Sequence, residues 1–183
     1  WRANLPTVHF YKIAVDDREP FYHGYGGTQD NCTLGGPSRT RWQHGILNSD
    51  WRVVLDGDGF QAAAEPGNPD VVYAQAQYAI LVRMDLASGD QTYIQPQAEP
   101  GEEPLRWNWD SPLVVSPHAP TRLYYAAQRV FRSDDRGDRW RPVSPDLTRR
   151  LDRDQLPVMG RVQRADAVAK NDSTSRSTRS AAY

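Results

Sequence analysis

The chain has 183 residues, which is enough for one ordinary domain with a sizeable core. Its 22 Lys and Arg residues nearly balance 23 Asp and Glu residues, and a net charge of −1 predicts no attraction to nucleic acid. No apolar run approaches the roughly 18 residues of a membrane-spanning helix, and the single cysteine, Cys32, excludes an internal disulfide.

Three units of the chain share one layout, in which a short strand leads through a proline-containing turn to a second strand with a central tyrosine and small residues. They are residues 10–27, 60–76 and 113–127. Asp16, Glu65 and Ser116 occupy equivalent points of these units, which gives a repeat of about 50 residues. A four-stranded β-propeller blade has a repeat of this size.

The segments between the units are of two kinds. The second unit continues through residues 80–94, where one strand, a Ser-Gly-Asp turn and a returning strand follow each other. Residues 31–58, rich in Gly, Arg and Trp, are interpreted as an insertion, and the proline-rich residues 95–110 as a long loop.

Helical periodicity is weak throughout, so the sequence predicts an all-β chain. We expect a partial β-propeller of about three four-stranded antiparallel blades in residues 1–148. Residues 149–183 are charged and then low in complexity, and we predict an irregular, disordered tail there. Three blades alone would leave two sheet faces uncovered, so we expect further blades or self-association to cover them.

One octapeptide, residues 133–140, fits the Asp-box pattern Ser-x-Asp-x-Gly-x-x-Trp of sialidase-like and sortilin-like propellers. Its four specified positions are Ser133, Asp135, Gly137 and Trp140. The pattern suits a β-hairpin corner, because the aspartate can accept backbone N–H groups, the glycine can take a positive φ and the tryptophan can cover the turn. The box therefore predicts a structural turn and no reaction.

Several motifs together resemble large bacterial sortilin/VPS10-like proteins with BNR repeats, over roughly residues 1–148. They are Tyr25-Gly26-Gly27-Thr28-Gln29-Asp30-Asn31, Asp50-Trp51 before Gly57-Asp58-Gly59-Phe60, Ser116-Pro117-His118, the Asp-box and Ser144-Pro145-Asp146-Leu147. The resemblance implies a long exported chain, secreted or periplasmic, that is often labelled glycosyl-hydrolase-like. It also implies that this chain, which begins at Trp1, is a fragment whose partners include the remaining blades of a parent protein.

Two acidic residues are candidate catalytic groups. Asp30 and Asp58 both follow glycine-rich approaches at strand ends, and such carboxylates can act as general acid and base on a glycosidic bond. The alternative is that both side chains cap amides of their turns, as aspartate commonly does. A set of three blades could hold only part of a hydrolase site.

The aromatic residues of the two long inter-strand segments are candidate ligand-binding groups. Trp42, Trp51, Trp107 and Trp109 lie there with Arg41. Exposed rings on loops can stack on sugars or form the wall of a peptide site, while an arginine can bind a carboxylate. The alternatives are that the tryptophans fill gaps between blades and that the arginine is solvated.

The sequence thus leaves two functions open. The first is a sortilin-like binding scaffold that recognises peptide or glycan through loop aromatics. The second is part of a glycoside hydrolase, sialidase-like or of the two-propeller glucanase type, that uses aspartate acid/base chemistry. We expect no cofactor and no metal site, since the four histidines have no metal-ligand spacing.

Overall fold

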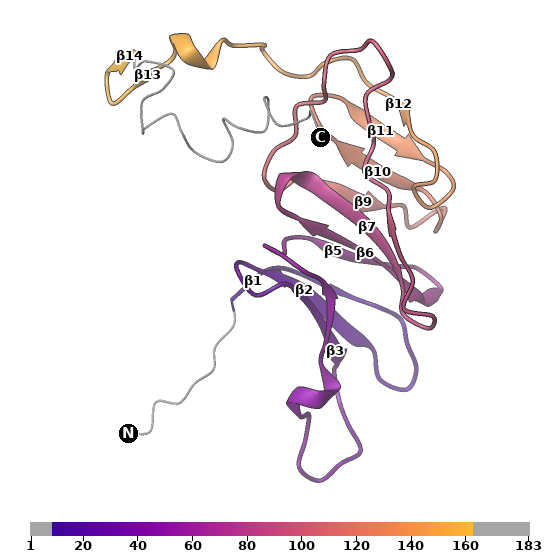
Figure 1. The fold of residues 1–183 in the computed structure, drawn as a ribbon. Coiled ribbons are helices and arrows are strands. Elements are labelled where there is room, and N and C mark those ends of the chain that lie inside the picture. The colour runs from indigo at the N-terminus through magenta and orange to yellow at the C-terminus, as the bar shows by residue number, and fades with distance from the viewer. Residues whose placement is uncertain (1–8, 163–183) are drawn as a thin grey trace.

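The structure, a computed structural model, describes residues 9–162 and is all-β. Three four-stranded antiparallel sheets follow one another along the chain (Figure 1). Blade 1 contains β1 (Phe10–Val15), β2 (His23–Thr28), β3 (Thr33–Pro37) and β4 (Arg52–Leu55). Blade 2 contains β5 (Ala62–Glu65), β6 (Asn68–Ala76), β7 (Ile80–Asp85) and β8 (Gln91–Tyr93). Blade 3 contains β9 (Leu113–Val115), β10 (Leu123–Ala126), β11 (Val130–Ser133) and β12 (Arg141–Pro142).

The remaining elements are short. Three single-turn helices are η1 (Asn48–Asp50), η2 (Gln77–Ala79) and η3 (Arg153–Gln155), and the last hairpin pairs β13 (Pro157–Val158) with β14 (Arg161–Val162). In Figure 1 this hairpin lies apart from the three sheets. The all-β, three-bladed fold is therefore confirmed. The predicted disordered tail lies outside the described residues from position 163 onward.

The strands of each blade pair in chain order, and the first strands of neighbouring blades contact one another. β5 contacts both β1 and β9, so the first strand of each blade faces a common centre, while the fourth lies on the outside (Figure 1). Residues 31–58, interpreted as an insertion, supply β3 and β4 and thereby complete blade 1. Of residues 31–58, the connection from β3 to β4, which includes η1, extends away from the sheets.

The core consists of two apolar layers, one between blades 1 and 2 and the other between blades 2 and 3. Tyr25 and Val54 of blade 1 pack on Val72 and Ala74 of blade 2. On the other side of blade 2, Tyr73 and Leu81 pack with Leu123 and Tyr125 of blade 3. β6 is buried on both of its faces from Val71 onward, which explains the consecutive apolar residues Val71 to Ala74 where an edge strand would alternate.

The equivalence of Asp16 and Glu65 has a structural basis. Each carboxylate ends the first strand of its blade, is buried, and accepts a hydrogen bond from a tyrosine hydroxyl of the second strand. Tyr25 donates to Asp16 at 2.9 Å, and Tyr73 donates to Glu65 at 3.1 Å. Burial and the neighbouring carboxylate raise the pKa of both tyrosines, so the hydroxyls remain protonated donors.

Candidate functional site

Two rims of the blade stack differ in what they carry. One rim holds the β2–β3 and β6–β7 turns together with the connections from each blade to the next; we call it the entry rim. The opposite rim holds the first turn of each blade and the β11–β12 turn, which is the Asp-box. Strand direction alone fixes this division, because successive antiparallel strands turn at alternate ends.

The entry rim carries a cluster of four aromatic rings, which we call the rim cluster: Tyr11, Phe60, Tyr78 and Trp109. Tyr11 stacks on Phe60 with ring centroids 5.2 Å apart, and Tyr78 meets Trp109 edge to face at 4.7 Å. Phe60 is buried and joins the two pairs through its 6.4 Å contact with Trp109. The outer rings stay accessible, since Tyr11 is 46% and Tyr78 39% exposed.

Each ring of the rim cluster is held by its own segment. Tyr11 lies on β1 and donates its hydroxyl hydrogen to Gln29 of the β2–β3 turn. Phe60 precedes β5, where its backbone carbonyl accepts the Gly27 N–H at 3.2 Å. A Cβ on Gly27 would lie 2.1 Å from the Phe60 nitrogen, so only glycine allows this approach of β2 to the chain entering blade 2.

Polar residues adjoin the rim-cluster residues in sequence. Lys12 and Asp110, next to Tyr11 and Trp109, form a 2.8 Å ion pair. Gln77, next to Tyr78, accepts the backbone N–H of Asp58 at 2.8 Å. Aromatic surface flanked by donors and acceptors is the usual composition of a ligand site.

Asp30 and Asp58 meet in the structure. The Asp30 backbone N–H donates to the Asp58 carboxylate at 2.8 Å, and Asp30 itself has a positive φ of 61°. A hydrogen bond to the Asp58 carboxyl group, with repulsion between the two charges, raises the pKa of Asp30. Flanking acids of glycosidases stand about 5–9.5 Å apart, which leaves space for the sugar or a water. Asp58 here accepts a turn amide, which is the capping role that aspartate commonly has.

The tryptophans do not gather in one place. Trp109 belongs to the rim cluster, whereas Trp107 packs on Tyr125 with centroids 5.1 Å apart, against the apolar layer between blades 2 and 3. Trp51 stacks on Phe10 at 6.4 Å, and Trp42 is 74% exposed in the β3–β4 connection, next to the exposed Arg41. The candidate ligand-binding residues therefore do not form a single site.

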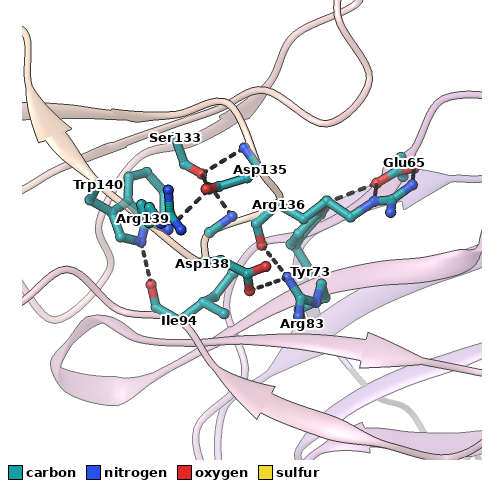
Figure 2. Close-up of polar contacts among 11 residues, drawn as sticks. Glu65, Tyr73, Arg83, Ile94, Ser133, Asp135, Arg136, Asp138, Arg139 and Trp140 are labelled. Carbon is teal, nitrogen blue, oxygen red and sulfur yellow. Dashed lines mark hydrogen bonds and ion pairs between the residues drawn. The ribbon is translucent and has the colours of Figure 1, made fainter.

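The Asp-box forms the β11–β12 turn (Figure 2). Ser133 Oγ donates to Asp135 at 2.8 Å and accepts the Gly137 N–H, also at 2.8 Å. Asp135 accepts the Arg139 N–H at 3.0 Å, and these hydrogen bonds lower the pKa of Asp135. Trp140 donates its indole N–H to the Ile94 carbonyl of blade 2 at 2.7 Å.

The same turn connects blade 3 to blade 2 through charged groups. Arg136, at the tip, makes two 2.8 Å contacts to the buried carboxylate of Glu65, and Arg83 of β7 reaches back to Asp138 at 2.9 Å (Figure 2). Arg83 also donates to the Arg136 carbonyl at 2.9 Å. The box therefore stabilises the junction between two blades.

Sequence reasoning missed three of the four rim-cluster residues. Tyr11 and Phe60 were assigned only to strands, and Tyr78 lies in a turn whose neighbours carry no motif. The signal that could have found them is position, because Tyr11, Phe60 and Trp109 each lie at or just before the first strand of a blade. Residues at equivalent ends of strands that meet at a common centre come together.

The described residues contain no group of three His, Cys, Asp or Glu side chains placed to hold a metal ion. Within residues 9–162 no helix has the length and apolar character needed to cross a membrane. Neither the protein-family models nor the curated proteins compared with this sequence give a match.

Proposed function

We propose that this chain is part of a sortilin/VPS10-like BNR-repeat propeller that acts as a binding scaffold for a peptide or a glycan. The observation that supports this most directly is the rim cluster, with its accessible Tyr11 and Tyr78 rings. Three blades hold these rings rigidly, so a ligand would lose little affinity to ordering of the site. By the same resemblance, we propose that the protein is exported, to the periplasm or outside the cell.

The chemistry of the rim cluster suits either ligand class. Exposed tyrosine and tryptophan faces stack on the apolar face of a sugar ring, and they also pack against peptide side chains. The Lys12–Asp110 pair and Gln77, which adjoin these aromatic residues in sequence, offer donors and acceptors. Asp58 accepts the Asp30 backbone N–H and so caps a turn, which favours binding over hydrolysis as the proposed function.

The test is a titration of the chain with two probe sets, soluble β-linked oligosaccharides and unstructured aromatic-rich peptides, followed by tryptophan fluorescence. We expect saturable binding to one set, weakened at least tenfold by Tyr78→Ala, which corresponds to about 1.4 kcal/mol. Trp42→Ala is the matched control, since this ring is exposed but lies in the β3–β4 connection. Binding that Trp42→Ala abolishes and Tyr78→Ala spares would refute the assignment to the rim cluster.

A further inference from the structure

Two sheet faces of the described residues have no neighbouring blade. The first, on the outer side of blade 1, presents Ile13, Val15 and Val53, which are 72%, 57% and 53% exposed; we call it the Ile13 face. The pairing of Ile13 with Gly26, Gly26 with Leu34, and Leu34 with Val53 puts these positions on one side of the sheet. Adjacent exposed apolar side chains of this kind mark an interaction surface.

The second face lies at the far side of blade 3. There Val114, Tyr124, Arg132 and Arg141 pair in succession across β9 to β12, and we call this the Tyr124 face. Val114 is 54% exposed and Tyr124 is partly exposed. The opposite side of the same blade is the one buried against blade 2, so the Tyr124 face is turned outward.

Register shows which surface the Ile13 face matches. Ile13 and Val15 stand three and one residues before Asp16, as Ala62 and Ala64 stand before Glu65. In blade 2 those alanines face blade 1, where they pack in the layer that contains the buried Tyr25. In blade 2, the surface equivalent to the Ile13 face therefore covers the tyrosine-bearing face of blade 1.

Register likewise identifies Tyr124. Tyr25 pairs with Ala14, Tyr73 with Ala63 and Tyr124 with Val114. Each of these partners lies two residues before the equivalent point of its blade, which is Asp16, Glu65 or Ser116. Tyr25 and Tyr73 are 1% and 0% exposed because the next blade covers them. Arg132 pairs with Tyr124 as Arg83 pairs with Tyr73, and Arg83 already donates across a blade junction to Asp138.

The two uncovered faces therefore correspond to the two sides of the junctions already present in the chain. Gly24 occupies the position that Val72 has in blade 2. A Cβ added to Gly24 would have no atom within 4 Å, so the Ile13 face has space for the ring of a partner residue. A contact between two different faces of two copies is heterologous. It gives a closed ring only if the rotation that relates the two copies brings the remaining two faces together. Two copies of the described blades give six, within the range of about four to eight blades that propellers use.

We propose that the Ile13 face binds the Tyr124 face of a second copy, and that two such contacts close a dimer. The 183-residue chain should sediment with twice its mass of 20.7 kDa. Ile13→Asp and Tyr124→Asp should each give monomers, because each change breaks both contacts of the dimer. An equimolar mixture of the two variants should pair again, since one contact then joins two unmodified faces.

The control is Leu147→Asp, which places the same charge at a residue that is 66% exposed and lies on neither face. It should remain dimeric. Circular dichroism checks that each variant is folded, and Val53→Asp repeats the test from β4 if Ile13→Asp disturbs β1. A monomeric wild-type chain, dimers that survive both face variants, or open polymers instead of a closed pair would each overturn the proposal.

Discussion

The ion pair between Glu65 and Arg136 allows a quantitative test of how the blades hold together. Glu65 is 2% exposed, so removal of the guanidinium in Arg136→Met leaves a buried carboxylate with the Tyr73 hydroxyl as its main donor. Loss of one partner of a buried pair typically costs about 3–5 kcal/mol. Because the Arg136 side chain is 41% exposed, water offsets part of this, and we expect about 2–3 kcal/mol. Methionine keeps the Cβ, so strain from the positive φ of residue 136 is unchanged.

The assay is thermal unfolding followed by circular dichroism. For a chain of this length, about 2–3 kcal/mol lowers Tm by about 4–12 °C. Arg122→Met is the matched control, because its ion pair with Asp134 is open to solvent and its loss should cost clearly less than that of the Glu65–Arg136 pair. In the double variant Arg136→Met/Glu65→Gln, the loss of stability should be smaller than the sum of the losses in the two single variants. Equal losses for Arg136→Met and Arg122→Met, or simple additivity, would refute the buried-pair reasoning.

Two further predictions concern the Asp-box. Gly137→Ala should destabilise the chain by about 1–3 kcal/mol more than Gly89→Ala in denaturant unfolding. Both glycines have positive φ, but only at Gly137 would the new Cβ meet a side chain, that of Ile94 at 2.6 Å. Equal losses of stability in the two variants would contradict this contact. The lowered pKa of Asp135 predicts that its contribution to stability is complete above the unfolded pKa of about 3.9 and is lost as pH falls through the lower folded value. The stability gap between wild type and Asp135→Asn should therefore be constant near neutral pH and shrink below about pH 4, and a gap that widens on acidification would show the sign to be wrong.

The fold could be predicted from the sequence because its signals are local. Each unit's strand, proline turn and tyrosine-bearing strand are contiguous, and Asp16 and Glu65 mark the same corner in two blades. β3 was missed because Gly35 and Gly36 weaken its strand pattern, and β4 was taken with it into the interpreted insertion. The two glycines make room for rings, since a Cβ on Gly36 would lie 2.6 Å from Trp51.

The site could not be predicted in the same way because its contacts join distant segments. Arg136 and Glu65 are 71 residues apart, and Tyr11 meets Phe60 across a blade boundary. Composition drew attention to tryptophan, but Trp107 packs against the layer between blades 2 and 3, while the less conspicuous Tyr78 lies in the rim cluster. Which aromatic ring is buried depends on the position of the next blade, and no local pattern records that position.

The junction between blades 2 and 3 implies an order of assembly. The side-chain amide of Gln75, itself buried, accepts the Ser111 N–H and donates to its carbonyl, and Gln61 does the same for Leu113. Both glutamines precede in the chain the segment that they align, and chains fold from the N-terminus during synthesis. We therefore expect blade 2 to serve as a template on which β9 starts.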